Sequence, residues 1–367
     1  MKKIIVKVIL WFLIVNIFAF ITLNRFNLKS DTAYEWMLYQ DIPPAEKSWD
    51  IVDLHNRWDT YWYLDIVQNG YYLKTDDTLS NVVFFPLYPL LIKIVGTIFF
   101  GNFLLAGWIL STMFLFLSVA YFYKLVKEFH PEIDPELPIL FLLIFPTAFF
   151  LSVIYTESLF LFLTLSCFYY AFKKEFWLAG FFAFLGAATH SNGIFLALPI
   201  LWEVWRTYGW KSIFTPKIIP VFFPAIVTGG FFLYHAIKFH DFFLFFKIES
   251  AFGRSFIPNK EHFSLFSHPA TVNLIIDTIF TIVILAVLYF VFKKLSALYG
   301  FFMLATIFSA LTSGTLMSIG RYSLVLFPMF ILLAGIKNKN WQMTWAFVSV
   351  IFLALDIILW VNNYWAG

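Results

Sequence analysis

Long apolar segments recur along almost the whole of this chain and limit the folds open to it. A membrane-spanning helix needs about 20 apolar residues, and several segments reach that length. Only 13% of the residues are charged and 61% are hydrophobic, whereas soluble domains carry about 25% charged residues. We therefore predict an all-α polytopic membrane protein. The apolar runs are 4–22, 84–100, 103–123, 138–153, 156–172, 176–189, 193–206, 218–238, 272–292, 296–312, 322–336 and 342–361.

The first run, residues 4–22, follows Met1, Lys2 and Lys3. A cleaved signal peptide would have a shorter apolar region, of about 7–15 residues, followed by a small-residue cleavage site. The segment "IFAFITLNRF" offers no such site. We therefore predict that this run is an uncleaved signal anchor.

The net charge argues against one class of partner, nucleic acid, and the cysteine content excludes no function. The net charge is only +3, and no basic patch stands out beyond short Lys and Arg groups beside the apolar runs. This argues against nucleic acid as a partner. Cys167 is the single cysteine and can form no internal disulfide, so it does not reveal the redox compartment.

Lys and Arg in short loops tend to stay cytoplasmic and so orient the spans. The basic groups all fall on one side only if the run 84–100 does not cross the membrane. Its sequence "FFPLYPLLIK" carries Pro86 and Pro89 in the first turns, which favours a short re-entrant or surface helix. We therefore predict about eleven spans, with the N-terminus inside and the C-terminus outside. The basic groups are Lys2, Lys3 and Lys7; Lys124 and Lys127; Lys173 and Lys174; Arg206, Lys211 and Lys217; Lys293 and Lys294; and Lys337 and Lys339.

This topology brings the polar islands of the chain to the outer face. The two largest are the first outer loop, 23–101, in which we expect juxtamembrane helices, and the outer loop 239–271. The parity of the spans places the polar residues on one side of the membrane without placing them in one cavity. The residues concerned are Asp59, Glu157, His190, Arg254 and Arg321.

Each of the two acidic residues has a structural and a functional interpretation. The segment "WDTYWYLDIVQNG" predicts a short helix that begins at Asp59 and ends at Asn69 and Gly70, where Asp59 would cap free N–H groups. A capping carboxylate keeps its charge and can still act as a base. Glu157 begins a long apolar run, where an ionisable group indicates function unless a cap or a partner charge explains it.

The same two interpretations apply to His190 and Arg321. A lone His among small residues is typical of a hydrogen-bonded structural group. No second His or Cys stands at metal-ligand spacing, so a zinc site is not predicted. Arg321, in "GRYSLVLFP", is either a snorkelling anchor at the end of a span or a phosphate ligand that uses paired donors.

Several motifs occur together in an order that resembles a known family. They are "RWDTYWYLDIVQNGYY", "FFPLYPLL", "FPTAFFLSVIYTESLFLF", "THSNGI", "LYHAIKFHDFFLFF" with "FGRS", and "GRYSLVLFP". Their order and spacing over roughly residues 55–330 resemble the PIG-V-like mannosyltransferases, integral membrane enzymes of the GT-C glycosyltransferase superfamily. The resemblance implies one GT-C-like transmembrane domain over residues 1–367.

The resemblance also implies a reaction. The donor would be a polyprenyl-phosphate-linked hexose, mannose in the eukaryotic relatives, which transfer the second mannose of the glycolipid anchor precursor. The acceptor would be a glycolipid or glycan, and Asp59 matches the acidic residue that serves as catalytic base. Many relatives have Arg where this chain has His190, which puts a phosphate contact there in doubt. The resemblance extends to the motif residues Arg57, Trp58, Tyr155 and Asn192 as substrate contacts, although the aromatic ones also suit an interfacial belt.

Inverting glycosyl transfer needs a base for the acceptor hydroxyl proton, and Asp59 suits that role. The departing lipid phosphate needs fixed positive donors, with Arg321 first and Arg254 or Lys260 second. Glu157 is the second carboxylate that we expect in the catalytic site, and a divalent cation, Mg²⁺ or Mn²⁺, stays possible beside the two carboxylates. The short loops favour a prokaryotic plasma membrane with the chemistry on its outer face.

A transporter or flippase of lipid-linked sugar is the alternative function. Multi-span chains with intramembrane charges are often transporters, which show internal repeats with interrupted helices in corresponding halves. We find no convincing repeat in this sequence, which favours the enzyme.

Overall fold

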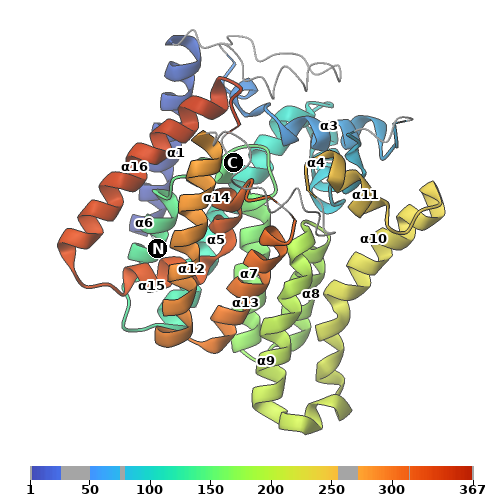
Figure 1. Ribbon diagram of the computed structural model, residues 1–367, viewed down its shortest axis with the longest axis vertical. Coiled ribbons are helices and arrows are strands. Elements are labelled where there is room, and N and C mark those ends of the chain that lie inside the picture. Colours follow the sequence, from blue (N-terminus) through green and yellow to red (C-terminus); the bar gives the residue numbers. More distant parts are fainter. Residues whose placement is uncertain (1, 26–49, 75–78, 255–271, 314, 366–367) are drawn as a thin grey trace. The chain divides into compact units, whose positions relative to one another are not determined.

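The computed structural model describes residues 2–25, 50–74, 79–254, 272–313 and 315–365. Every regular element within these ranges is helical (Figure 1). By length and composition, five helices are suited to crossing a membrane. This confirms an all-α protein of multi-pass membrane character. The five are Lys2–Arg25, Phe103–Phe129, Pro216–Phe239, Ile275–Lys294 and Lys339–Val361.

The helix lengths do not reproduce eleven full spans, because prolines interrupt several apolar runs. The run 138–153 contains Pro146, and it forms α6 (Glu136–Leu143) followed by a separate 3-10 turn. A helix of this size covers about 12 Å, well short of the roughly 30 Å hydrocarbon core. The run 322–336 is divided in the same way, and α15 (Phe327–Ala334) has Pro328 in its first turn.

The shorter elements connect the long ones. Among them, α4 (Leu87–Ile98) is a short helix, as predicted for the segment "FFPLYPLLIK". The others are η1 (Asp53–His55), η2 (Asn81–Val83), η3 (Ala148–Leu151), α7 (Glu157–Phe172), η4 (Ser191–Leu196), η5 (Gly209–Phe214), η6 (Pro216–Phe222), α14 (Ile319–Tyr322) and η8 (Ser323–Val325).

The described chain divides into two compact units, each assembled from separate stretches of sequence. Unit 1 comprises Met1–Val67, Leu90–Leu159 and Gly320–Gly367, and unit 2 comprises Gln68–Pro89 and Phe160–Ile319. The expectation of a single GT-C-like domain over residues 1–367 stays a prediction.

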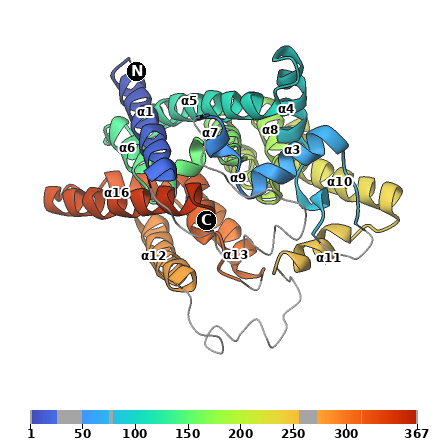
Figure 2. The same cartoon turned by 90° about the horizontal axis from the view of Figure 1, so that it is seen from above.

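Unit 1 is a group of long helices packed through aromatic side chains. Helix α1 (Lys2–Arg25) packs on α16 (Lys339–Val361), as Figure 2 shows from above. Helix α6 packs on α15 and on α5 (Phe103–Phe129). The ring of Phe122 meets that of Phe327 at 6.1 Å, and the ring of Phe150 meets that of Trp360 at 5.0 Å. These contacts bring the C-terminal segments of the chain onto its first half.

The short helix predicted in the first outer loop is present with the predicted limits. Helix α3 spans Asp59–Asn69, and Gly70 after it has a φ of +72°. Its first turn is tied down, because the Thr60 hydroxyl donates to the carbonyls of His55 at 2.9 Å and Ile154 at 3.2 Å. The start of α3 is therefore held against the turn that precedes α7.

Unit 2 contains α8 (Phe176–Ala187), α9 (Ala197–Tyr208), α10 (Phe223–Phe239), α11 (Leu244–Ala251) and the α12–α13 pair (Val272–Lys294 and Ala297–Leu311). Helix α8 packs on both α10 and η4. The contact with η4 depends on Gly193, where an added Cβ would lie 2.3 Å from the Gly186 carbonyl oxygen.

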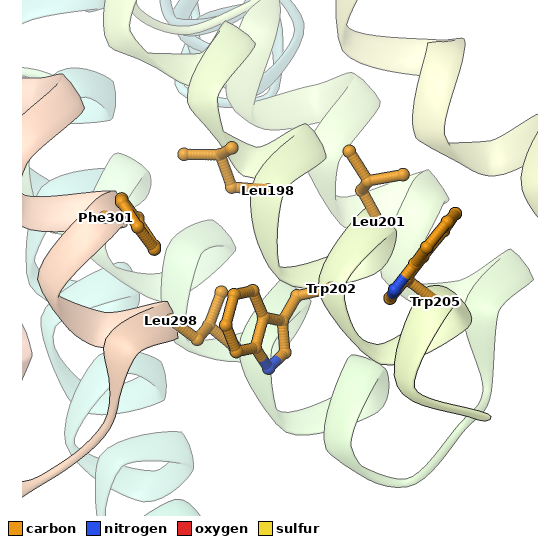
Figure 3. Close-up of a pocket in the computed structure, with 6 residues that line it drawn as sticks. All are labelled: Leu198, Leu201, Trp202, Trp205, Leu298 and Phe301. Carbon is orange, nitrogen blue, oxygen red and sulfur yellow. The ribbon is translucent and has the colours of Figure 1, made fainter. Parts of the chain in front are cut away.

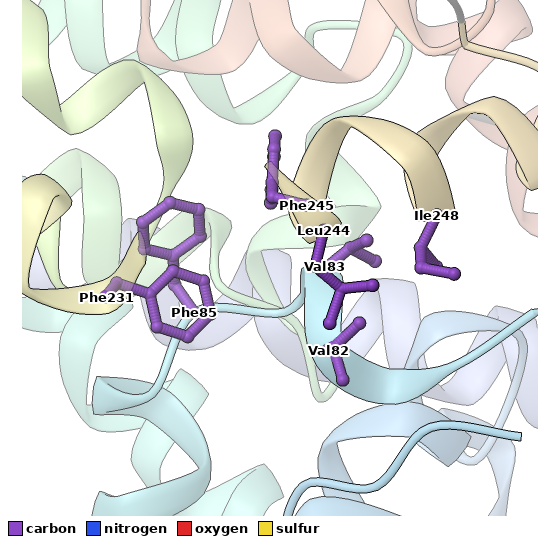
Figure 4. Packing of buried hydrophobic residues seen from close by; sticks show 7 residues of the cluster. All are labelled: Val82, Val83, Phe85, Phe231, Leu244, Phe245 and Ile248. Atoms are coloured by element: carbon purple, nitrogen blue, oxygen red, sulfur yellow. The ribbon is translucent and has the colours of Figure 1, made fainter. Parts of the chain in front are cut away.

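Part of the outer loop 239–271 is helical rather than a plain connection. Its apolar "FFLFF" segment supplies α11, which packs on η2. Leu244, Phe245 and Ile248 of α11 join Phe231 of α10 in a buried cluster completed by Val82, Val83 and Phe85 (Figure 4). Leu244 and Phe245 of this segment and Ile248 after it are buried, and their burial stabilises a helix here more than exposure in a loop would. Residues 255–271 lie outside the described ranges.

We expect Gly193→Ala to destabilise the protein, since its Cβ would meet the backbone of α8, which cannot rotate away. The loss should be on the order of 2–3 kcal/mol. Gly229→Ala is the matched control: this α10 glycine has nothing within 4 Å of an added Cβ, so the change should gain about 0.5–1 kcal/mol. Melting temperatures of both variants in detergent check this, and equal values would contradict the close contact.

Candidate functional site

Three charged side chains from distant parts of the sequence meet within unit 1. Asp59 is the first residue of α3, Glu157 is the first residue of α7, and Arg321 lies in α14. Arg321 Nη1 donates to Asp59 Oδ2 at 2.9 Å, and Arg321 Nε lies 3.3 Å from Glu157 Oε1. One guanidinium therefore bridges two carboxylates.

The two carboxylates differ in their access to the surroundings. The side chain of Glu157 is 7% exposed and that of Arg321 is 6% exposed, whereas the Asp59 side chain is 19% exposed. Glu157 Oε2 is buried and has no hydrogen-bond partner among the described residues. With all three groups ionised, the cluster carries one net negative charge. Asp59 is thus the carboxylate that an outside molecule can reach.

Aromatic rings surround the guanidinium. The Arg321 Cζ atom lies 5.1 Å from the centre of the Tyr155 ring and 5.5–5.7 Å from the centres of three others, those of Phe150, Tyr322 and Trp365. Aromatic faces attract a cation at such distances. The rings and the carboxylates together fix the orientation of the Arg321 fork.

Tyr155 connects this ring of aromatics to the start of α3. Its hydroxyl oxygen accepts a hydrogen bond from the Asp59 backbone N–H at 2.9 Å. Burial and then the negative charge of Asp59 raise the pKa of Tyr155 well above its usual range. The phenol therefore stays protonated and holds the α3 N-terminus in place as a neutral group.

Trp58, the residue before α3, is fixed by the C-terminal segment. It is buried, its backbone has a φ of +51°, and its indole N–H donates to the Tyr364 carbonyl at 3.2 Å. Its ring meets that of Trp365 edge-on at 5.0 Å. A strained backbone held by such contacts is frequent at functional sites. Residues 364 and 365 thus help to shape the cluster.

Arg57 has a different set of partners from Arg321. It is buried, and its Nη1 donates to the carbonyls of Asp53 and Asn56, both at 2.8 Å. Its guanidinium also lies 3.9 Å from the Asp53 carboxylate. These contacts stabilise the turn of η1, and the substrate contact expected of Arg57 stays a prediction.

The remaining predicted site residues belong to unit 2, apart from Lys260, which lies outside the described ranges. His190 Nδ1 accepts from the Asn192 backbone N–H at 3.1 Å, which caps η4, and its ring stacks on Phe160 at 5.0 Å. Arg254 donates to the Ser318 hydroxyl at 3.3 Å. His190 therefore caps η4 within its own unit, and the substrate contacts expected of His190 and Arg254 stay predictions.

The acidic cluster fits a divalent cation poorly. Magnesium and manganese bind oxygen ligands in a compact shell. Here the Arg321 cation stands between the two carboxylates and uses one oxygen of each. Within the described ranges, no three His, Cys, Asp or Glu side chains gather as a metal-binding group. We therefore assign no metal to the two carboxylates.

Comparison with known proteins adds no relative. The chain matches no protein-family model, and no curated protein matches it at a significant level. A functional assignment therefore depends on the geometry of unit 1.

Sequence reasoning selected Asp59, Glu157, Tyr155 and Arg321, which the structure brings together, but it missed the other three aromatic residues around Arg321, namely Phe150, Tyr322 and Trp365. Phe150 and Tyr322 lie in motifs already quoted, beside predicted site residues. Trp365 lies in the C-terminal "NNYW", which follows the last apolar run. The sequence signal that could have indicated Trp365 was its pairing with Tyr364 in a polar turn on the predicted outer side.

We expect Arg321→Ala to destabilise the protein by about 3–5 kcal/mol, because it leaves two carboxylates buried or half-buried without their cation. Adding Glu157→Gln should restore part of this loss, since it removes one of the two negative charges. Lys7→Ala is the control, because its pair with Glu136 is exposed and should contribute about 0–1 kcal/mol. The measurement is the melting temperature of the unchanged protein, Arg321→Ala, Arg321→Ala with Glu157→Gln, and Lys7→Ala. An Arg321→Ala variant no less stable than Lys7→Ala would refute the bridging role.

Proposed function

We propose that this chain is an integral membrane glycosyltransferase that moves a hexose, with mannose as the first sugar to test, from a polyprenyl-phosphate donor to a glycolipid or glycan acceptor. One observation carries the proposal: the Asp59 carboxylate is partly exposed, stands at a helix N-terminus and is oriented by Arg321. A base for glycosyl transfer needs that combination of access and fixed direction.

The reaction that this arrangement supports is a single displacement with inversion. The acceptor hydroxyl oxygen attacks the anomeric carbon of the donor while Asp59 takes the hydroxyl proton. The bond between that carbon and the phosphate oxygen breaks, and its electron pair leaves with the lipid phosphate. The phosphate is a stable anion, so the step needs no acid for the leaving group.

Arg321 acts in this proposal as a positioning residue for Asp59. Its charge already faces two carboxylates, so a lipid phosphate would have to compete with both of them. This makes Arg321 less suited to the first-choice phosphate role that the sequence suggested. Arg254 and Lys260 stay the second-choice candidates for that contact.

The proposal includes a GT-C-like topology of about eleven spans with the cluster on the outer face. Its support is the clustering of basic residues beside alternate apolar runs. The prokaryotic plasma membrane is the proposed location.

Reporter fusions test the topology. Fusions after Lys127, Lys174, Lys217, Lys294 and Lys339 should report the cytoplasm, because these sites follow the basic groups. Fusions after Gly70, within 255–268 and at Gly367 should report the outside. A cytoplasmic signal at Gly367 together with an outside signal at Lys127 would show that the run 84–100 crosses.

For the activity, we expect Asp59→Asn to lower turnover on the order of a hundredfold or more, because it removes the base while keeping nearly the same volume. The assay follows transfer of labelled mannose from a polyprenyl-phosphate donor by the purified full-length protein. Donor binding should be largely kept, because Asn has nearly the same volume as Asp and keeps an oxygen that can cap α3.

Asp53→Asn is the control, since Asp53 lies in the same outer segment and its side chain is one-third exposed. It should retain near-normal turnover. An Asp59→Asn enzyme as active as Asp53→Asn would remove Asp59 from the mechanism. Uptake of the labelled lipid into vesicles without transfer would favour the transporter instead.

A further inference from the structure

Unit 2 has an apolar groove that the proposed reaction does not use. It has a volume of about 390 Å³ and lies between α9 and α13 (Figure 3). This volume falls within the roughly 300–1,000 Å³ of small-molecule sites. All the side chains that line it are apolar: Leu198, Leu201, Trp202, Trp205, Leu298 and Phe301.

The side chains that form the walls of the groove are held in place by packing against neighbouring helices. The rings of Trp202 and Phe301 lie 6.2 Å apart across α9 and α13. Phe301 in turn meets Phe292 of α12 at 5.3 Å, and a Cβ at Gly300 would lie 2.4 Å from that ring. The close α12–α13 contact therefore supports one side of the groove from behind.

Two lysines stand at one end of this helix pair. Lys293 and Lys294 are exposed and end α12, and only Leu295 and Ser296 separate them from α13. Ser296 caps α13 by accepting from the Tyr299 N–H at 3.3 Å, which fixes the turn. Leu298, one turn after Lys294, lines the groove. The Nζ atoms of the two lysines lie 4.6 Å from the centre of the Tyr289 ring and 5.4 Å from that of the Phe290 ring, both on α12. The basic pair therefore stands at the end of α12 that leads into the α13 wall of the groove.

Other charges at this end do not cancel the lysines. The one buried carboxylate of α9, Glu203, already pairs with Arg206 at 3.0 Å. Lys211 in η5 is exposed and adds a further positive charge. In the described part of unit 2, the end of the groove marked by α12 and η5 is therefore positive.

Tryptophans place the same end at the level of the lipid headgroups. Trp205 and Trp210 follow one another along α9 and η5 and are more than half exposed. Tryptophan collects at the boundary between hydrocarbon and headgroup, with Lys and Arg beyond it. The groove thus starts at the headgroups and continues into the hydrocarbon layer.

We propose that the groove binds one acyl chain of an anionic phospholipid, whose phosphate contacts Lys293 and Lys294. The apolar walls exclude a polar occupant, and the lysines favour a lipid whose headgroup has net negative charge. A zwitterionic lipid offers the same chain but compensates its own phosphate. The site is independent of the proposed glycosyl transfer.

Binding of phosphatidylglycerol and phosphatidylcholine to the full-length purified protein tests the site, by native mass spectrometry and by the melting temperature at increasing lipid. Phosphatidylglycerol should bind more tightly and raise the melting temperature more. The double change Lys293→Gln and Lys294→Gln should weaken its binding roughly thirtyfold, because each basic residue near an anionic lipid contributes roughly a fivefold factor. Phosphatidylcholine binding should not change.

The matched charge control is Lys337→Gln with Lys339→Gln, which removes the same charge at the start of α16. To test the acyl-chain contact, Leu201→Trp should fill the groove and weaken the binding of both lipids. Leu178→Trp on α8 is the control and should not weaken it, because Leu178 lies outside the groove and is as exposed as Leu201, at 43% against 41%. Equal binding of both lipids, or equal effects of the two lysine pairs, would overturn the headgroup contact. Equal effects of the two tryptophan variants would overturn the groove.

Discussion

The ion cluster of Arg321 with Asp59 and Glu157 is the constraint around which unit 1 is arranged. Taking such charges out of water costs several kcal/mol for each ion, and only close partners offset that penalty. Asp59 and Glu157 each begin a helix, where the free N–H groups favour a negative charge. Helix ends and the guanidinium therefore stabilise the same two carboxylates. Three segments must come together for any of them to be buried.

The aromatic residues that surround this cluster do more than fill space. Rings of Tyr155 and Trp365 face the guanidinium, and each also contacts the backbone or side chains at the start of α3. His55 is also enclosed by aromatic rings: its ring stacks on that of Trp108 at 5.2 Å and on that of Phe149 at 6.2 Å. Burial, then the charge of Arg57, lowers the pKa of His55 to about 3. The histidine is therefore neutral and packs as another ring between Trp108 and Phe149.

The sequence allowed local features to be predicted better than long-range ones. The limits of α3 follow from Asp59, Asn69 and Gly70, because the signals that start and end a helix are local. The all-helical membrane class follows from apolar content, which needs no knowledge of contacts. The eleven-span count rested on run lengths, and Pro146 shows why length alone is a weak guide, since it divides a run between α6 and η3.

The partner of Asp59 could not be predicted, because 262 positions separate it from Arg321. Topology placed both on one face, but many pairings satisfy that condition. The same limit explains Arg57, which is nearer to Asp59 in sequence and yet bonds to the carbonyls of its own turn. Choosing between two arginines requires the path of the whole chain.

The asymmetry between the two carboxylates is what gives the cluster a direction. Glu157 is buried and reaches Arg321 through Nε, while Asp59 is more exposed and reaches it through Nη1. A guanidinium held on two sides and ringed by aromatics cannot turn without breaking one contact. Asp59 is thereby held in one orientation, because Glu157 pairs with the Nε side of the same arginine. A carboxylate that acts as a base on an incoming hydroxyl gains from being held in this way, since its direction is set before the acceptor arrives.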